Sequence, residues 1–118
     1  MFYMTLKLNS KKCLPCEGGV APLTPDAIQT YSTEVKDWTV TEDSKKIRRE
    51  FIFKNFVSAL EFVNKVADLA EQENHHPDIH IFYNKVVLEL WTHAIGGLSE
   101  NDFIVAAKID VQKLETRS

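Results

Sequence analysis

One long amphipathic segment constrains the fold of this chain more than any other feature of its sequence. The apolar residues of this segment recur at helical spacing, i, i+3, i+4 and i+7: Phe56, Ala59, Leu60, Val63, Val66, Ala67 and Ala70. Asn55 precedes the repeat and is a suitable N-terminal cap, and Pro77 follows it and disfavours helical backbone at the preceding residue. We therefore predict a helix that begins after Asn55 and ends near residues 74–77, with His75 and His76 at its C-terminus.

Two strand-like segments precede this helix. Residues 38–40 and 45–53 are separated by the polar residues 41–44, which is typical of a hairpin loop. The longer segment has an apolar face and a charged face, as a half-exposed strand does. Its apolar face carries Ile47, Phe51 and Phe53. Basic residues alternate between the two sides of the strand and favour a solvated surface over a nucleic-acid stripe: Lys45, Lys46, Arg48 and Arg49.

Two further strand-like segments follow the long helix. Residues 79–83 and 86–93 lie on either side of Asn84 and Lys85, a pair compatible with a tight turn. In the second segment the side chains alternate between two faces. One face carries Val86, Leu88 and Leu90, and the other carries Val87, Glu89, Trp91 and His93.

Shorter helices are expected at both ends of this pattern. Thr24, Pro25 and Asp26 combine a capping residue, a proline suited to the first helical turn and an acid at the positive end of the helix dipole, which predicts a helix over residues 25–36. Residues 99–102 have the S-x-x-D pattern of a helix start and predict a last helix of about ten residues.

The order of these elements predicts the fold class. A helix followed by β-β-α-β-β-α favours a two-layer α+β fold, in which a four-stranded antiparallel sheet has helices on one face. The other face of the sheet and its edge strand are then uncovered, and self-association is one way to protect them.

Length and composition agree with one ordinary domain. The chain has 118 residues, which leaves little room for two cores, and we divide it into an N-terminal arm, residues 1–23, and a packed domain, residues 24–118. A formal net charge of -3 argues against nucleic acid or anionic lipid as a main partner. The longest apolar runs are too short for a membrane span, and we expect a cytoplasmic protein.

All four histidines lie between positions 75 and 93. An unperturbed imidazole titrates near pH ~6.5, so it exchanges protons at neutral pH. Glu71 lies one helical turn before His75, where its carboxylate is expected to accept a hydrogen bond from that ring. This favours acid–base chemistry, although His75 and His76 also fit a simple helix cap and turn. His93 is equally compatible with a structural role, and His80 is expected to face solvent.

A metal site is the competing hypothesis. It requires His75, His80 and His93 to converge, with Glu71 or Asp102 as a carboxylate ligand. The sequence lacks the H-E-x-x-H spacing and a compact Cys/His set, and it also lacks the glycine-rich nucleotide motifs. The expected metal content is therefore none.

Cys13 and Cys16 form a lone C-x-x-C in the arm. Two cysteines are too few for a disulfide framework, and the pair lacks the strand and helix context of a thioredoxin-like site. We interpret them as ordinary arm residues, with a zinc site shared across a dimer or redox sensitivity as the alternatives.

Several separated motifs together resemble one family. They are E-Q-E-N-H-H-P at residues 71–77, Y-N-K-V at residues 83–86, L-W-T-H at residues 90–93 and G-L-S-E-N-D at residues 97–102. With Trp38 and the strand around residues 49–56, they make residues 24–110 resemble pterin-4a-carbinolamine dehydratases. This resemblance implies dehydration of a 4a-hydroxytetrahydropterin to the quinonoid dihydropterin by homodimers or homotetramers, without metal or organic cofactor.

The resemblance also implies site residues. His75, His76 and His93 match the three catalytic histidines of the family, and Glu71 matches its supporting acid. We expect His75 with Glu71 to form one proton-transfer unit, His93 to form the other, and His76 to bind and orient the pterin. Asp102 matches the final aspartate of the motif, as a substrate-binding residue or a helix cap. The sequence leaves open which histidine is the acid and which is the base.

One departure from the family pattern concerns the wall of the site. Some relatives have tryptophan two residues after His-His-Pro, where this chain has Ile79. Trp91 and Phe82 are possible substitutes, although packing is the more ordinary role for both. The family resemblance also includes a dimerisation partner of a homeodomain transcription factor, so a coactivator-type binding module is the alternative function.

Overall fold

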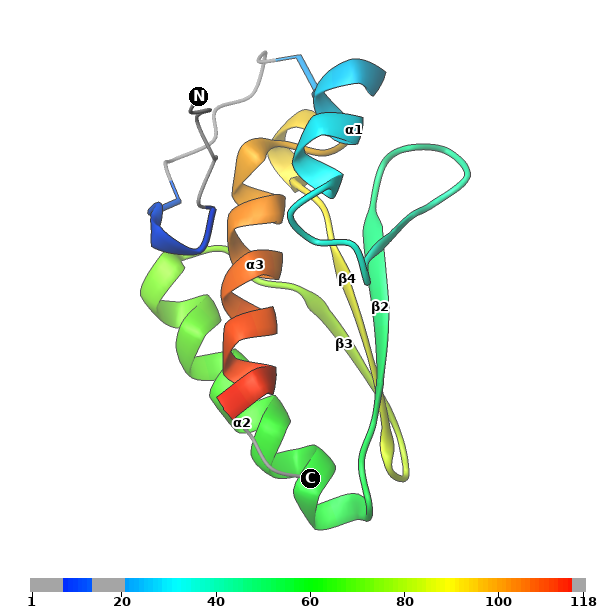
Figure 1. Ribbon diagram of the computed structural model, residues 1–118, viewed down its shortest axis with the longest axis vertical. Coiled ribbons are helices and arrows are strands. Elements are labelled where there is room, and N and C mark those ends of the chain that lie inside the picture. Colours follow the sequence, from blue (N-terminus) through cyan, green and yellow to red (C-terminus); the bar gives the residue numbers. More distant parts are fainter. Residues whose placement is uncertain (1–7, 14–20, 116–118) are drawn as a thin grey trace.

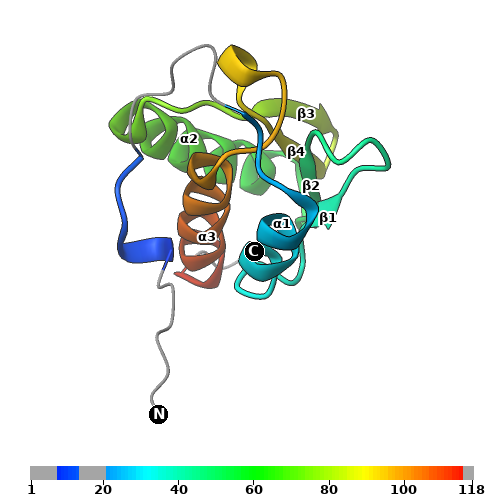
Figure 2. The ribbon, with the colours of Figure 1, turned by 90° about the horizontal axis from the view of Figure 1, so that it is seen from above.

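The computed structural model describes residues 8–13 and 21–115. Within these residues, helices form one layer against a four-stranded antiparallel sheet with the strand order β1-β2-β4-β3, which confirms the predicted α+β class (Figures 1 and 2). The main elements are α1 (Pro25–Ser32), β1 (Thr39–Val40), β2 (Ile47–Ile52), α2 (Phe56–Glu73), β3 (Asp78–Phe82), β4 (Lys85–Leu90) and α3 (Glu100–Glu115), with 3-10 turns η1 (Leu8–Ser10) and η2 (His93–Ile95).

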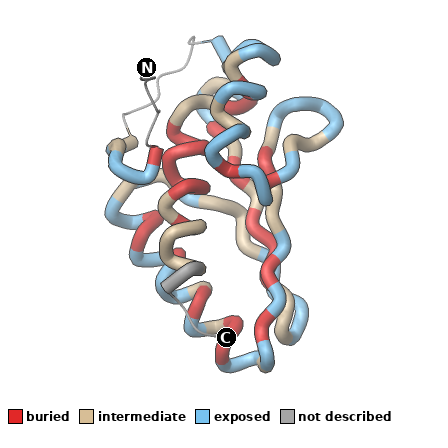
Figure 3. Tube along the Cα trace, in the orientation of Figure 1, coloured by how far each residue is buried: buried red, intermediate tan, exposed pale blue. Residues whose placement is uncertain are grey.

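The sheet separates an apolar face from a polar one, as the period-two pattern predicts. In the register of β2 and β4, Phe51 pairs with Val86 and Ile47 with Leu90, and all four residues are buried. Buried and more exposed positions alternate along the strands in Figure 3. The Phe62 ring of α2 packs on Phe51, with 4.7 Å between ring centroids. This contact joins the helix layer to the sheet.

Helix α2 begins and ends where its local sequence predicts. The Asn55 side chain caps it by accepting a hydrogen bond from the backbone N–H of Ser58 at 2.8 Å. At the other end Asn74 adopts a left-handed conformation, with φ 53° and ψ 40°, and terminates the helix. The chain therefore leaves the helical path one residue before His75.

Helix α3 is longer than the expected ten residues and lies between α1 and α2 (Figure 2). A helix with neighbours on several sides is apolar around much of its circumference, so its amphipathic period is weak. Nearly all of its first ten residues are buried, most of them apolar: Phe103, Ile104, Val105, Ala106, Ala107 and Ile109.

The structure corrects three predicted boundaries: the end of the first helix, the turn between β3 and β4, and the end of the last strand. Helix α1 ends at Ser32 instead of residue 36, and the chain continues through turns that still bury Val35. The β3–β4 turn is formed by Tyr83 and Asn84 because Phe82 pairs with Lys85.

The last strand also ends early. Strand β4 stops at Leu90 instead of continuing to residue 93, because Thr92 makes an isolated pair with Gly97 and pulls the chain out of the sheet. His93 therefore begins the turn η2.

The described part of the predicted arm packs on the helices. Leu8 is fully buried in the core, and its backbone N–H donates to the Glu34 carboxylate at 3.1 Å. The backbone N–H of Cys13 donates to Glu73 at 2.9 Å. Residues 8–13 therefore contribute to the packed unit. None of the helices in residues 8–13 and 21–115 has both the length and the hydropathy that are needed to span a membrane.

Candidate active site

A cavity of about 460 Å³ opens where α2 ends and β3, η2 and α3 begin. Three of the predicted site residues, His75, His76 and His93, line this cavity together. They come from two loops separated by the β3–β4 hairpin, and the sheet brings those loops together. Asp78, Trp91 and Asn101 also contribute to its wall.

His75 is held from behind by a buried carboxylate. Its Nε2 lies 2.6 Å from Oδ1 of Asp102, and the two side chains are only 12% and 0% exposed. A carboxylate accepts, so Nε2–H donates and Nδ1 of the neutral ring is left as the proton acceptor. The pair therefore sets the tautomer and orientation of an imidazole at the cavity wall.

Asp102 is in turn satisfied on its second oxygen. The Thr92 hydroxyl donates to Oδ2 at 2.8 Å, and the backbone N–H of Ser99 donates to the same oxygen at 2.9 Å. The Ser99 hydroxyl lies 2.8 Å from the Thr92 oxygen, and it donates there because the Thr92 proton is used by Asp102. Three hydrogen bonds thus hold a fully buried carboxylate, as burial of a charge requires.

Asp102 lies in the first turn of α3, where the helix dipole favours a negative charge. Its bond to the Ser99 N–H is the reciprocal half of a capping box, as the S-x-x-D motif predicts. A side chain without exposed surface does not reach a ligand in the cavity, so the structure gives no support to direct substrate binding by Asp102. It acts on the cavity through His75.

Glu71 pairs with a different histidine from the one expected. Its Oε2 lies 2.6 Å from Nε2 of His76, and the two side chains are exposed. The expected Glu71–His75 pair assumed that helical spacing continues to residue 75, but the left-handed turn at Asn74 redirects the chain. The hydrogen bond orients the His76 ring. Because both side chains are exposed, the pair adds little to the free energy of unfolding.

His93 is exposed at the start of η2. Its ring packs on the indole of Trp91, with 3.8 Å between centroids and 33° between planes. Among the residues that the structure describes, no side chain is hydrogen-bonded to the His93 imidazole. The three cavity histidines are therefore held in three different ways.

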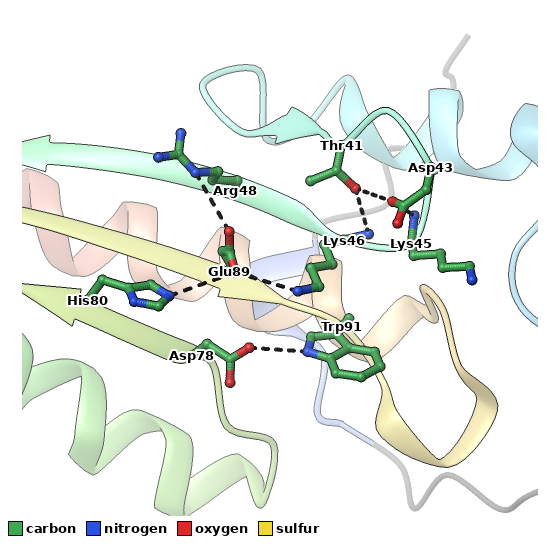
Figure 4. Close-up of polar contacts among 9 residues, drawn as sticks. All are labelled: Thr41, Asp43, Lys45, Lys46, Arg48, Asp78, His80, Glu89 and Trp91. Carbon is green, nitrogen blue, oxygen red and sulfur yellow. Dashed lines mark hydrogen bonds and ion pairs between the residues drawn. The ribbon is translucent and has the colours of Figure 1, made fainter.

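His80 is outside this cavity. It lies on the outer face of the sheet, where its Nε2 is 3.8 Å from Glu89, which confirms the expected solvent-facing position (Figure 4). The alternative metal set required His80 to converge with His75 and His93, but His80 does not line the cavity that those two share. Within residues 8–13 and 21–115, no group of three or more histidine, cysteine, aspartate or glutamate side chains is arranged to hold a metal ion.

Cys13 lies behind the site instead of in it. Its thiol is 3.7 Å from the backbone carbonyl of Asn101. Burial, with the nearby Glu73 carboxylate, raises the pKa of this thiol to about 12, so it stays protonated and unreactive at neutral pH. Cys16, the other member of the predicted C-x-x-C, lies outside the described residues.

Sequence reasoning underestimated Trp91 and did not single out Thr92. The period-two pattern already places Trp91 on the same side as His93, and this was the available signal. Thr92 carries no comparable signal, because its hydroxyl gains importance only through a carboxylate on another helix. Ile79, at the position of the tryptophan in some relatives, packs against the core.

Comparison with known proteins identifies the family of this chain. The family described as pterin 4 alpha carbinolamine dehydratase matches residues 21–112. A protein of Rickettsia bellii, provisionally named pterin-4-alpha-carbinolamine dehydratase, is 45% identical over 108 residues, which are 92% of this chain and 96% of its own. A protein of Nitrosospira multiformis with the same provisional name is 50% identical over 103 residues, 87% of this chain and 89% of its own.

Solved structures share the fold. One described as a transcriptional coactivator/pterin dehydratase from Brucella melitensis has a TM-score of 0.73 and 31% identity, covering 76% of this chain and 96% of that one. A pterin dehydratase-like protein described as a RuBisCO assembly factor has a TM-score of 0.55 and 21% identity, a likeness of fold alone. The chain belongs to the pterin-4-alpha-carbinolamine dehydratase family, as the sequence motifs predict.

Proposed function

We propose that the protein dehydrates a 4a-hydroxytetrahydropterin to the quinonoid dihydropterin, with imidazole side chains moving the protons. The observation that carries this proposal is the meeting of His75, His76 and His93 around one cavity. Family membership supports the reaction class, and the cavity volume suits a small flat heterocycle.

The reaction needs two proton transfers and no redox step. The bond between C4a and the hydroxyl oxygen breaks as that oxygen takes a proton and leaves as water, and the neighbouring ring nitrogen loses its proton as the new C=N bond forms. One group must give a proton and another must accept one, and imidazoles do both near neutral pH. The balance is complete without a metal or an organic cofactor.

The contacts suggest a division of roles. His75, with its tautomer set by Asp102, supplies one proton-transfer group, and the exposed His93 supplies the other. His76, oriented by Glu71 at the rim, binds the substrate. In this assignment Asp102 replaces Glu71 as the carboxylate that supports His75.

A dehydration assay on freshly generated 4a-hydroxytetrahydropterin tests the proposal. The wild-type protein should accelerate dehydration, and alanine at His75 or His93 should each reduce the rate by about 100-fold or more. The His80→Ala variant is the matched control, because it removes an exposed histidine outside the cavity and should keep the full rate. Normal rates in both cavity variants would exclude the proposal and favour a binding module.

We further propose that the protein self-associates through the edge of the sheet. Strand β3 is an edge strand, and the neighbouring row Ile52, Lys85 and Phe82 leaves both apolar side chains exposed on the outer face. An uncovered edge with apolar neighbours favours pairing with a second copy. Light scattering should give the mass of a dimer or tetramer, and Phe82→Lys should shift it toward the monomer.

A further inference from the structure

Trp91 is placed between the sheet and the cavity. It directly follows β4, and its side chain lines the cavity instead of joining the apolar core. The His93 ring lies against the indole at a centroid distance of 3.8 Å. This aromatic side chain therefore lies next to a proposed proton-transfer group, and its other contacts indicate its role.

The indole is itself held in place from two directions (Figure 4). Its Nε1–H donates to Oδ2 of Asp78, in the first residue of β3, at 3.2 Å. The Lys46 ammonium lies 5.3 Å from the centroid of the ring and is also 3.7 Å from the Glu89 carboxylate. Hydrogen bonding and the cation–π contact together restrict rotation of the indole.

The His93 ring depends on this support more than the other cavity histidines do. His75 and His76 each have a carboxylate partner at 2.6 Å, whereas the only ring contact described for His93 is Trp91. A proton-transfer group must be held in position, because a displacement of about 1 Å reduces the rate by up to about 100-fold. The face of an indole also stabilises an imidazolium formed during the reaction.

We propose that Trp91 is a positioning residue for His93, and that Asp78 secures Trp91 for this purpose. The inference rests on the proposed dehydratase function for its catalytic consequence, but the stacking itself is a property of the resting protein. Asp78 belongs to β3, and His93 belongs to the exposed turn η2. The indole contacts both residues and therefore ties the His93 ring to the sheet.

The resting-state arm of the test measures the His93 ring by NMR. An indole shifts the ring protons of a stacked imidazole upfield, so Trp91→Leu should move the His93 resonances downfield and Trp91→Phe should move them part of the way. Resonances are assigned by their absence in His93→Gln. Unchanged His93 resonances in Trp91→Leu would overturn the proposal, whatever the activity of the protein.

The kinetic arm separates positioning from substrate contact. Loss of positioning lowers kcat, and we expect about a tenfold or greater loss in Trp91→Leu with KM within about twofold of wild type. Trp91→Phe and Asp78→Ala should each give a smaller loss of kcat. A raised KM with unchanged kcat would overturn the proposal and make Trp91 a wall for the substrate.

Trp38 provides the matched control. It also donates its indole N–H to an aspartate, Asp110, at 2.9 Å, but it lies in the core away from the cavity. Trp38→Phe should leave the His93 resonances and kcat unchanged while lowering the unfolding midpoint. If wild-type protein lacks dehydratase activity, the proposed function fails, and the NMR comparison still decides whether Trp91 holds His93.

Discussion

His75 and His93 face the same cavity but are held in opposite ways. His75 belongs to a buried polar network in which Asp102 connects the end of α2, the end of β4 and the start of α3. His93 is exposed, and its ring rests on the indole of Trp91. The contacts of His75 therefore help to stabilise the fold, whereas the contact of His93 lies at the surface.

Substitutions around the two histidines should therefore differ in their effects on the free energy of unfolding and on activity. A change in the His75 network leaves buried polar groups without partners, so it affects the free energy of unfolding and the site together. A change at His93 removes an exposed ring and its stacking on Trp91, but leaves no buried polar group without a partner. The two halves of the site should therefore respond differently when activity and stability are measured in the same variants.

The largest effect is expected at Asp102. Asp102→Ala leaves the His75 ring, the Thr92 hydroxyl and the Ser99 N–H without their acceptor, and these three unsatisfied donors together should lower the free energy of unfolding by about 3 to 5 kcal/mol. Urea unfolding measures this loss. The dehydration rate should also fall by at least about 100-fold, because the tautomer of His75 is no longer set.

Asp102→Asn separates the two effects of that change. The amide oxygen still accepts from Thr92 and Ser99, while the amide NH2 faces Nε2 of His75 and favours the opposite tautomer. Activity should be lost with a much smaller loss of stability. Full activity in the asparagine variant would contradict a role of Asp102 in setting the tautomer of His75.

Alanine variants of His75 and His93 compare the two halves directly. Both should lose activity, but His75→Ala should also lower the free energy of unfolding by about 1 to 3 kcal/mol, since it leaves the buried Asp102 oxygen without a donor. His93→Ala should change that free energy by less than about 0.5 kcal/mol. Thermal and urea unfolding measure the difference. Equal free energies of unfolding in the two variants would contradict the claim that only the His75 contacts stabilise the fold.

Thr92 tests the outer part of the buried network. Thr92→Val keeps the shape of the side chain but removes the hydroxyl that donates to Asp102 and accepts from Ser99, and should cost about 1 kcal/mol of stability. The matched control is Thr92→Ser, which keeps the hydroxyl. If the serine and valine variants lose equal stability, the methyl group and not the hydrogen bonds explains the effect.

Glu73, the last residue of α2, gives the smallest expected effect. Substituting it tests whether polar contacts beyond the His75–Asp102 network also stabilise the fold. Burial acts to raise the pKa of this carboxyl, but the Cys13 N–H and the Lys108 ammonium at 2.6 Å outweigh it, so the pKa is lowered from 4.5. A lowered pKa stabilises the fold above the unfolded value, and that contribution is lost as pH falls through the folded value.

The pH dependence of unfolding checks this assignment. Wild-type protein should lose the stability that this group contributes as pH falls below 4.5, and Glu73→Gln should remove that part of the dependence. The parent and variant curves should therefore converge at acid pH. A constant difference between the two curves at every pH would show that Glu73 contributes through packing alone.

Much of the fold could be predicted because its signals are local. The apolar repeat from Phe56 and the cap at Asn55 define α2, and alternation in residues 45–53 defines the buried face of β2. Helix α3 was predicted too short, because a helix surrounded by other elements loses the polar side that makes a period visible. The end of β4 was misplaced for a similar reason, since the contact of Thr92 with Gly97 is not a strand pattern.

The residues of the candidate site were also present in the sequence, but their pairing was not. Motif resemblance selected three histidines, Glu71 and Asp102, and the cavity contains the three histidines. Helical spacing assigned Glu71 to His75, yet Glu71 contacts His76. Trp91 was interpreted as a packing residue because its partners are distant in sequence: Asp78 lies in β3, and Lys46 directly precedes β2.

The amino-acid sequence by itself determined the order of helices and strands, their buried faces and the residue types available for proton transfer, because periodicity, caps and motifs are set by near neighbours. The tertiary structure decided which carboxylate serves which imidazole. A left-handed residue at Asn74 turns the chain away from Glu71, and the start of α3, 27 positions along the chain, delivers Asp102 to His75. Such partners depend on where whole elements pack, which local spacing does not specify.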